Sequence, residues 1–302
     1  MGSLFKQIYR YTRPRSYRHN ENLWPWTKIQ RAPDGEICAL HYKGVKVPLV
    51  SLSALRNSAQ GEVMLTATGP STRDIDFKKL PATLPVMGVN GAYSLALDVQ
   101  FSLYLIVDME FFDKRRELVE AIVADSRVVL FTTMHGIAKI RDRHSAGLKC
   151  RLALIEDACY KIYQPKVADK MMWEMYKNCQ PMRFCTDRRD ICFSTDIRQG
   201  IFDAGTVVYW ALQILCFMGF EKILISGLDM NNFHQPRFYE TAQDRLPSYL
   251  ENKVDNIVIP SFAHAAQVLK ENKSSVVNFS LNSAVPDSVF TKVFFDDYFK
   301  NR

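Results

Sequence analysis

Small and polar residues follow several of the apolar runs in this sequence. The first such group, Thr68-Gly69-Pro70-Ser71, closes the run 62–68. Its glycine lets an anion or nucleotide approach the backbone, its proline fixes the turn, and the amide and hydroxyl of Ser71 can donate to a phosphate. A tight turn with a capping serine explains the same residues equally well, so the group indicates a phosphate site without establishing one.

Two more polar groups occupy similar positions. Asn90 follows the run 86–89, and Asp108 follows the run 103–107. An amide or a carboxylate at such a position can hold the base or ribose of a nucleotide. Taken singly, each is also an ordinary loop-favouring residue at the end of a strand.

A fourth group, Asp203-Ala204-Gly205-Thr206, precedes an apolar segment of helical spacing that ends at Gly219. A strand then leads to Gly227-Leu228-Asp229. A helix that starts at a glycine offers its first amides to an anion. Asp203 can instead be a helix cap, and its carboxylate would repel a phosphate.

Well-known catalytic motifs are missing from the sequence. There is no GxxxxGK[ST] loop, no GxGxxG after a strand, no HExxH and no GxSxG, which leaves ATPase, ordinary dinucleotide-binding, metalloprotease and serine-hydrolase interpretations without support. Asp74-Ile75-Asp76 has the spacing of a metal-binding DxD. It directly follows the first turn, where carboxylates at a helix start are expected, so the structural interpretation is favoured.

The elements that must position these groups alternate along the chain. Apolar runs predict strands at 62–68, 86–89, 103–107, 128–132, 152–155, 223–225, 257–259 and 276–279, and helical spacing predicts helices at 114–124, 166–178 and 205–218. This alternation predicts an α/β fold with a doubly wound, mostly parallel sheet. Because ligands bind at the carboxyl ends of strands in such sheets, we expect the four polar groups to meet there.

The N-terminal residues differ in character from the rest. Residues 1–60 are expected to form an annex with a basic aromatic arm and a hairpin of 37–40 and 45–50. Residues 61–302 are expected to form the main domain, with a helical insertion near 135–200.

The arm has a distinctive charge. The chain has 302 residues and a formal net charge of +7. Seven of its basic residues, interleaved with Phe, Tyr and Trp, fall in the first 31 residues: Lys6, Arg10, Arg13, Arg15, Arg18, Lys28 and Arg31. This mixture suits an anionic membrane surface. A nucleic-acid contact or a solvated arm remains open, but no nucleic-acid motif appears elsewhere, so the membrane surface is preferred.

The apolar stretches and the cysteines of the sequence indicate where in the cell the protein is located. The longest apolar stretch of helical character, 207–218, is shorter than the ~20 residues that span a bilayer. The N-terminus has no apolar run long enough for a signal peptide. The seven cysteines have no paired spacing and are expected to be reduced thiols. These features predict a cytoplasmic globular protein.

In order along the chain, the polar groups resemble a known family. The segments TATGPS, VNGAYSL, LIVDMEFF, AGTVVYWALQILCFMGFEKILISGLDM and FSLNSAV resemble the bacterial CMP-sialic-acid transferases. The closer resemblance is to the bacterial lipopolysaccharide core Kdo transferases, over roughly residues 60–285. It is carried by Val89-Asn90-Gly91, Asp108 with Arg115-Arg116, Ser226-Gly227-Leu228-Asp229, Arg237-Phe238-Tyr239-Glu240 and Leu246-Pro247-Ser248.

The resemblance implies a modified Rossmann-like glycosyltransferase fold of the GT-A variant type. It also implies CMP-Kdo as donor, an inner-core sugar hydroxyl of lipopolysaccharide as acceptor, and release of CMP at the cytoplasmic face of the inner membrane. Inversion is expected, since CMP-Kdo is a β donor and the linkages formed are α. No cofactor is expected, because CMP has a single phosphate, and dependence on Mg²⁺ is left open.

Other functions are kept beside this one. The sialyltransferases have Asn where this chain has Thr68, a difference that weakly favours Kdo over sialic acid as the donor sugar. The alternatives are transfer from CMP-sialic acid and a non-catalytic nucleotide-binding protein at the membrane surface.

The resemblance also implies roles for individual residues. The nucleotide would be held by Thr68, Gly69, Pro70, Ser71, Asn90, Asp108, Gly205, Thr206 and Asp229. Arg237 and Tyr239 would bind the Kdo carboxylate, because arginine matches a carboxylate in a bidentate fork. Arg115 and Arg116 would face acceptor phosphates or form a solvated helix end. The expected general base is His264, with His135 and Asp203 as alternatives.

Overall fold

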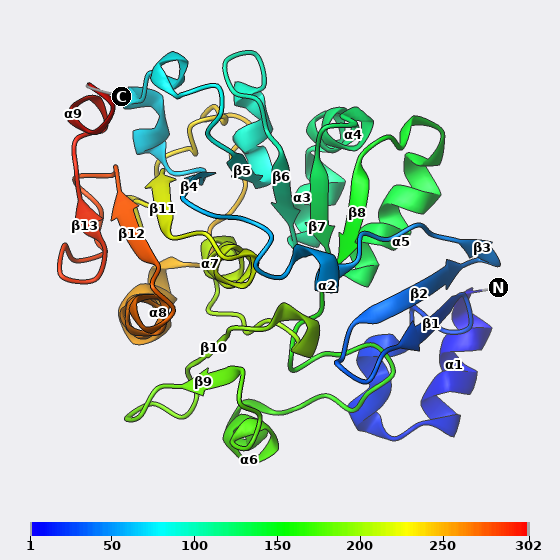
Figure 1. Ribbon diagram of the computed structural model, residues 1–302. Coiled ribbons are helices and arrows are strands. Elements are labelled where there is room, and N and C mark those ends of the chain that lie inside the picture. The colour runs from blue at the N-terminus through cyan, green and yellow to red at the C-terminus, as the bar shows by residue number, and fades with distance from the viewer. Residues whose placement is uncertain (1, 301–302) are drawn as a thin grey trace.

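An eight-stranded sheet forms the centre of the computed structural model, which describes residues 2–300. Its strand order is β13-β12-β11-β4-β5-β6-β7-β8, and every neighbouring pair is parallel. The strands are β4 Glu62–Thr66, β5 Val86–Val89, β6 Leu103–Ile106, β7 Val129–Thr132, β8 Arg151–Leu154, β11 Lys222–Ser226, β12 Ser275–Asn278 and β13 Thr291–Lys292. The mostly parallel sheet is confirmed (Figure 1).

The order of the strands reverses once. The chain adds β5 to β8 on one side of β4, then returns to place β11 to β13 on the other side. The reversal falls between β4 and β11, which pair from Lys222↔Glu62 to Ser226↔Thr66. Open parallel sheets bind ligands outside the carboxyl ends of their strands at such a reversal.

Helices cover both faces of the sheet. The main ones are α3 Met109–Lys114, α4 Arg116–Ala124, α5 Met134–Arg143, α7 Val207–Met218, α8 Ile259–Glu271 and α9 Phe295–Phe299. Successive side chains of β4 point to opposite faces. Val63 and Leu65 belong to the core shared with α7 and α8, and Met64 belongs to the core shared with α3, α4 and α5. The doubly wound α/β class is therefore confirmed.

Helix α7 is the most deeply buried helix of the core. Ten of its twelve residues are buried. The hydroxyl of Thr206 accepts a hydrogen bond from the amide of Val208, and Gly219 ends the helix in the left-handed conformation at φ 96°. A side chain at Gly219 would also lie 2.9 Å from the carbonyl oxygen of Ala59. The sequence predicted this helix and its stop, and both are confirmed.

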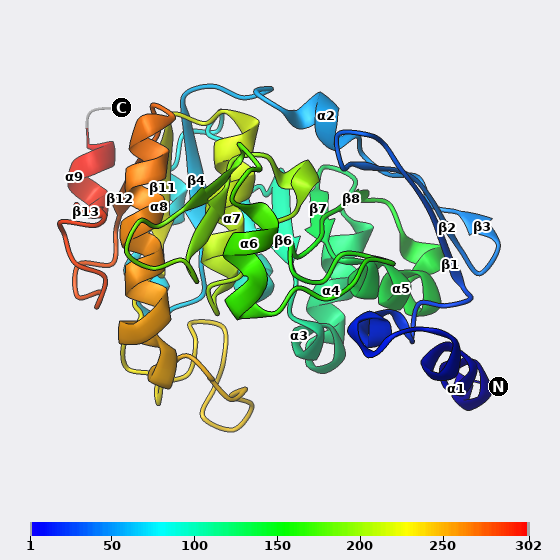
Figure 2. The same cartoon turned by 90° about the horizontal axis from the view of Figure 1, so that it is seen from below.

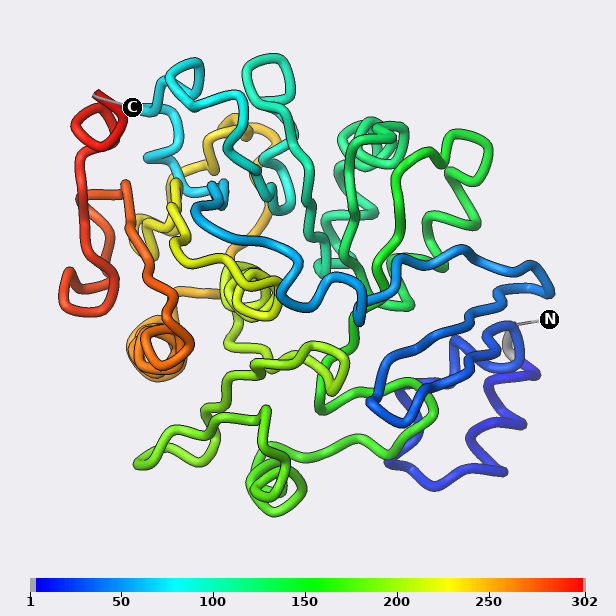
Figure 3. Tube along the Cα trace, viewed as in Figure 1, coloured from blue at the N-terminus to red at the C-terminus, as the bar shows by residue number. Residues whose placement is uncertain are grey.

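The N-terminal segment adds a separate small sheet at the β8 end of the main sheet (Figure 3). It contains α1 Gly2–Thr12, the 3₁₀ helix η1 Arg15–Asn20, β1 Thr27–Arg31, β2 Ile37–Tyr42 and β3 Val45–Lys46. The strands are antiparallel in the order β1-β2-β3. The hairpin of β2 and β3 was predicted, whereas its partner strand β1 was not.

The remaining elements are short. They are α2 Leu52–Leu55, α6 Met172–Tyr176, and the antiparallel pair β9 Met182–Phe184 and β10 Cys192–Ser194. Within the expected insertion 135–200, α5 and β8 belong to the main α/β layers, and the residues after β8 carry α6 and the small β9–β10 sheet. The division into domains stays a prediction.

Three of the expected elements differ in the structure. The expected strand 257–259 is wrong: Val254–Val258 is a π-helical turn, η9, that continues into α8. Val254, Val258 and Phe262 are all buried at a spacing of four residues, which suits a helix face and not a strand. The expected helix 114–124 begins earlier and is interrupted at Arg115, where ψ is 51°. The expected helix 166–178 is reduced to α6 and a 3₁₀ turn.

Two further features concern the cysteines and the lengths of the helices. All seven cysteines are free. Within residues 2–300, no helix combines the length and the apolar character that crossing a bilayer requires.

Candidate active site

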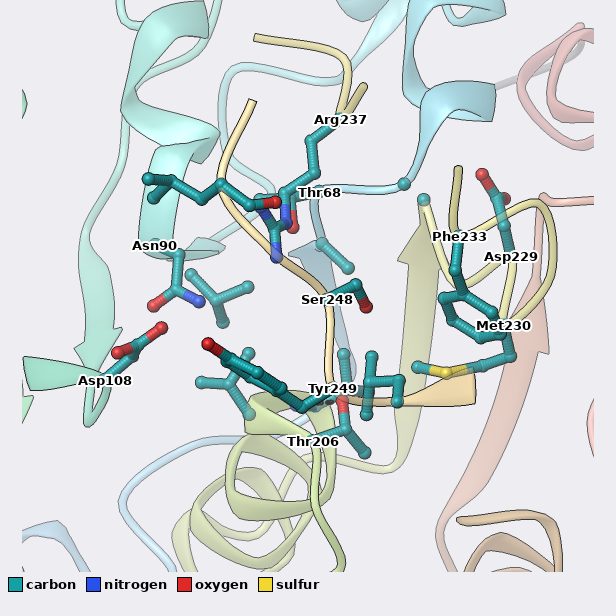
Figure 4. A pocket seen from close by; sticks show the side chains of 18 of the residues that line it. Thr68, Asn90, Asp108, Thr206, Asp229, Met230, Phe233, Arg237, Ser248 and Tyr249 are labelled. Carbon is teal, nitrogen blue, oxygen red and sulfur yellow. Dashed lines mark hydrogen bonds between the residues drawn. The ribbon is translucent and has the colours of Figure 1, made fainter. Parts of the chain in front are cut away.

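A cavity of about 430 Å³ lies at the reversal of the strand order. The ends of β4, β5, β6 and β11, the start of α7 and the loop 229–253 form its walls (Figure 4). The predicted site residues that line it are Thr68, Gly69, Pro70, Asn90, Asp108, Asp203, Gly205, Thr206, Asp229, Arg237 and Tyr239. The four polar groups of the sequence therefore do meet at one edge of the sheet.

Five predicted residues do not line this cavity: Ser71, Arg115, Arg116, His135 and His264. Ser71 is nearest, because it belongs to the same turn as Gly69. Its amide donates to Asp229 Oδ2 at 2.9 Å, and its hydroxyl donates to Asp229 Oδ1 and contacts Ser280 Oγ at 2.7 Å. The donors that we expected to face a phosphate are thus bonded to a carboxylate of the protein.

Gly69 allows this arrangement. A Cβ atom at Gly69 would lie 2.5 Å from both Asp229 Oδ2 and the carbonyl oxygen of Gly227. The turn after β4 and the loop after β11 consequently approach each other more closely than any other residue would permit. The glycine of the first motif joins two walls of the cavity.

Asn90 and Asp108 present acceptor atoms to the cavity (Figure 4). Asn90 has φ 45°, and its side-chain Oδ1 is buried without a hydrogen-bond partner in the described chain. Asp108 caps α3 through Oδ1, which accepts from the amides of Glu110 at 2.8 Å and Phe111 at 3.3 Å. No described residue donates to its Oδ2. Asp108 is exposed, whereas the buried Asn90 Oδ1 without a donor is costly, so a ligand that donates a hydroxyl or amino hydrogen to Asn90 would stabilise this wall.

Tyr239 and Arg237 belong to the loop over the cavity. The Tyr239 ring lies on Gly91, where a Cβ atom would be 2.2 Å from the ring, and burial raises the pKa of its hydroxyl to about 12. Arg237 donates to the buried Glu240 at 2.8 Å and to the carbonyl oxygens of Leu246 and Pro247 at 3.3 and 3.4 Å. Arg237 therefore orders its own loop as well as facing the cavity.

Arg115 supports this loop from below. It contacts Glu240 at 3.4 Å and Asp244 at 2.8 Å, and its guanidinium lies 5.6 Å from the centre of the Tyr239 ring. Arg116, the first residue of α4, is exposed and donates to the carbonyl oxygen of Asp113 at 3.3 Å. The adjacent arginines of the motif thus have different surroundings, one beneath the loop and one in solvent.

Lys253 was not predicted from the sequence. It lines the cavity at the start of α7, where its Cδ lies 3.3 Å from the position of a Cβ on Gly205. No carboxylate in residues 2–300 forms an ion pair with it, whereas the other lining cation, Arg237, is paired with Glu240. The sequence around Lys253 matches no motif, and only the folding of the loop brings this charge to the helix start.

Asp203 is the predicted catalytic residue that lines the cavity. Its Oδ1 accepts from the indole of Trp210 at 2.8 Å, and its Oδ2 accepts from the amide of Gly205 at 3.0 Å. These bonds fix the orientation of a carboxylate that can accept a proton from a sugar hydroxyl. Behind it, Asp157 follows β8, and burial, with the charges of Asp203 and Asp169, raises its pKa to about 7.

Both predicted histidines lie elsewhere. His264 is buried on α8, and its Nε2 is 2.6 Å from the carbonyl oxygen of Arg183, a contact to β9. Burial lowers its pKa. His135 is in the first turn of α5, and burial, with the neighbouring charge of His19, lowers its pKa. The structure therefore separates both imidazoles from the lining of the cavity.

Metal-ligand clusters are also relevant to a transfer reaction. Among residues 2–300, no group of three or more His, Cys, Asp or Glu side chains has an arrangement that could hold a metal ion.

The family model that matches this chain describes the 3-deoxy-D-manno-octulosonic acid transferase WaaZ and covers residues 48–293. The chain belongs to this Kdo transferase family. Every lining residue of the cavity falls within the matched segment. Membership makes the protein a glycosyltransferase and confirms the family that the sequence motifs indicated.

Similar proteins include two named probable 3-deoxy-manno-octulosonic acid transferases. The one from Salmonella typhimurium is 25% identical over 233 residues, which cover 73% of this chain and 81% of that protein. The one from Escherichia coli is 21% identical over 239 residues, which cover 76% and 82%.

Similar solved structures include the sialyltransferase CST-II. Its complex with a trisaccharide acceptor and CMP is 14% identical, with a TM-score of 0.41, over 78% of this Kdo transferase and 87% of that chain. A complex of the Campylobacter jejuni enzyme CstII with cytidine-5'-monophosphate is 13% identical, with a TM-score of 0.38, over 76% and 83%.

Proposed function

We propose that this Kdo transferase moves Kdo from CMP-Kdo to a hydroxyl of the lipopolysaccharide inner core. The observation that carries the proposal is the distribution of unpaired groups in the cavity. Asn90 Oδ1 is a buried acceptor without a protein donor, Asp108 Oδ2 is an exposed acceptor, and Lys253 is an exposed cation without a carboxylate partner in residues 2–300. A nucleoside monophosphate offers hydroxyl groups to the acceptors and a phosphate to the cation.

The phosphate is assigned to the start of α7. The start of a helix carries its positive dipole end. At α7 the amides of Gly205 and Val208 already donate to Asp203 and Thr206, so the assignment depends on the charge of Lys253. Lys253 adds a full charge beside Gly205. In this arrangement the CMP phosphate is stabilised as negative charge develops on its leaving oxygen, which favours the transition state over the bound donor.

The reaction is a single displacement at the anomeric carbon of Kdo. The acceptor hydroxyl oxygen forms the new bond, the bond from that carbon to the phosphate oxygen breaks, and CMP leaves with the electron pair. The hydroxyl proton passes to Asp203, whose carboxylate lines the cavity. Attack from the side opposite the phosphate inverts the configuration, so a β donor gives an α product. Arg237 and Tyr239 face the Kdo carboxylate.

The nature of the acceptor also determines where in the cell the proposed reaction takes place. The inner core is attached to a lipid, so the reaction takes place at an anionic membrane surface, on the cytoplasmic side where this proposal puts the donor. The protein is accordingly a peripheral enzyme of the inner membrane.

A transfer assay tests the proposal. CMP-Kdo is generated in place from Kdo and CTP by a synthetase, and an inner-core oligosaccharide freed of its lipid is the acceptor. The expected result is one equivalent of CMP and a product heavier by one Kdo residue, measured by mass spectrometry. A parallel reaction with CMP-sialic acid should give no product. Transfer from CMP-sialic acid but not from CMP-Kdo would assign the enzyme to the alternative sugar.

A further inference from the structure

Helix α1 carries an exposed apolar row. The exposed fractions of Leu4, Ile8 and Tyr11 are 61%, 38% and 90%. Their spacing of four and three residues places them on one face of the helix. Three large apolar side chains in one row form a continuous surface, unlike apolar residues that are exposed singly.

An adjoining face of α1, one residue further round the helix, is anchored to the protein. The Phe5 ring meets the Trp24 and Trp26 rings edge-on at 5.9 and 5.5 Å, and the Tyr9 ring lies 5.9 Å from Trp24. Tyr9 is buried. The packing of this second row fixes the orientation of the helix. The first row therefore stays exposed when the protein is free in solution.

Unpaired arginines continue from the exposed row. Arg13, Arg15 and Arg18 are exposed, and no carboxylate in residues 2–300 pairs with any of them. Glu21 is the one acidic residue among the first 31, and it is paired with Arg10 at 2.6 Å. The segment therefore presents apolar side chains and uncompensated positive charge together, which is the composition of a helix that lies in the interface of an anionic bilayer.

The position of α1 in the molecule matches this partner. Figure 2 shows α1 and the loop 229–253 projecting from the same side of the molecule, the side on which β4 ends. The cavity opens at the carboxyl ends of the strands, beneath that loop. A surface contacted by α1 would thus be on the side of the protein where an acceptor enters.

We propose that Leu4, Ile8 and Tyr11, with Arg13, Arg15 and Arg18, dock the protein on an anionic lipid bilayer with the cavity on the membrane side. The inference rests on the proposed function for its lipid-linked acceptor, but the docking surface can be tested without any nucleotide. It also lies outside the segment 48–293 that the family model covers.

Sedimentation with lipid vesicles tests the docking surface. The full chain is mixed with vesicles of phosphatidylglycerol and phosphatidylcholine, or of phosphatidylcholine alone, and the bound fraction is measured. We expect binding to the anionic vesicles only. The double variant Leu4→Ser/Ile8→Ser and the triple variant Arg13→Gln/Arg15→Gln/Arg18→Gln should each lower the partition coefficient roughly tenfold or more.

Matched controls separate the surface from general effects. Leu97→Ser removes an apolar side chain that is 99% exposed between the 3₁₀ helix η4 Asn90–Leu95 and β6. Lys46→Gln/Arg56→Gln/Arg151→Gln removes the same charge from exposed residues that form no ion pair within residues 2–300. Both controls should bind anionic vesicles like the unmodified protein, and all variants should keep their affinity for CMP.

Three outcomes would overturn the inference. One is equal loss of vesicle binding in the control and α1 variants, which would assign the binding to net charge. The second is a dimer in analytical ultracentrifugation that the Leu4→Ser/Ile8→Ser variant dissociates, which would assign the row to a second copy of the chain. The third is binding to an RNA or DNA oligonucleotide, but not to vesicles, that the arginine variant abolishes. If the unmodified protein did not bind CMP, that result would instead count against the proposed function.

Discussion

At the scale of residues, the cavity divides its polar groups between those that hold the protein together and those left for a ligand. Ser71 and Asp229 bond to each other, and Arg237 is paired with Glu240. Asn90, Asp108 and Lys253 retain unbonded capacity toward the cavity. Residues whose polar groups have no protein partner are therefore better candidates for ligand contacts than motif residues such as Ser71 and Arg237, which bond within the protein.

Lys253→Gln should weaken CMP binding about ten- to hundredfold and leave cytidine binding unchanged, because a charge-assisted contact to a phosphate contributes about 1.5–3 kcal/mol and cytidine has no phosphate. Calorimetric titration with both ligands measures the difference. Lys270→Gln, at an exposed lysine near the end of α8, is the matched control. Equal weakening of both ligands in the Lys253 variant would show that it acts on the loop and not on the phosphate.

Asp203→Asn should lower kcat by about 10²–10⁴-fold while the affinity for CMP changes little, since a general base acts on the acceptor hydroxyl and not on the nucleotide. Single-turnover transfer measured beside CMP titration separates the two effects. His264→Ala is the informative comparison, because His264 lies on α8 against the carbonyl of Arg183. If His264→Ala removed transfer and Asp203→Asn did not, the base would have to be reassigned.

At the scale of elements, close approaches between turns and loops shape the cavity. Gly69 lets the loop after β11 meet the turn after β4, and Gly91 lets Tyr239 lie on the backbone after β5. Arg115 and Glu240 then hold the loop that carries Tyr239. The loop 229–253 is positioned by these contacts, since it has no strand and only the short helix η8 Glu251–Lys253.

Gly91→Ala should displace the Tyr239 ring, because the added Cβ would lie 2.2 Å from it, and should thereby loosen the loop. We expect faster proteolysis within residues 229–253 and a fall in transfer of tenfold or more by the misplacement of a loop that covers the reactants. Limited proteolysis with mass spectrometry measures the first effect. Gly147→Ala is the control, since no atom lies within 4 Å of the added Cβ. Cleavage at the unmodified rate in the Gly91 variant would contradict this account.

The elements also explain which predictions succeeded. Strands β4 to β8, β11 and β12 are short apolar runs with turn residues after them, and local sequence identifies such runs well. The run 257–259 has the same composition but continues a face with Phe262, so its helical neighbours decide its conformation. Strand β13 has only two residues and no local pattern.

The site was predictable only where local sequence places its residues. Residues placed by a strand end, such as Asn90 and Asp108, could be identified because every parallel strand ends at the same edge. Lys253 and the separation of His264 from the cavity depend on the path of a long loop and on the packing of α8. Neither follows from the spacing of residues in the sequence.

At the scale of the whole molecule, burial of Asp157 near the site makes stability depend on pH. Burial raises the pKa of Asp157 to about 7 from a usual value of 3.8. The folded protein therefore binds this proton more tightly than the unfolded chain. Between these two values the free energy of unfolding falls as pH rises, by about 1.4 kcal/mol per unit at most from this group.

Asp157→Asn should remove this contribution. Relative to the unmodified protein, the variant should become progressively more stable as pH is raised from 5 to 8, because its amide has no proton to lose. Urea unfolding at a series of pH values measures the difference. A constant difference between the two proteins over this range would mean that Asp157 ionises at the same pH in both states.

The cavity at the reversal of the strand order is expected to bind CMP. The most direct measurement is calorimetric titration of the protein with CMP, UMP and ADP, with and without Mg²⁺, together with the variant Asn90→Ala. We predict selective binding of CMP that does not need Mg²⁺ and that Asn90→Ala weakens, since Asn90 Oδ1 is buried without a protein donor. Binding of UMP or ADP but not CMP, or unchanged CMP affinity in the variant, would contradict the account.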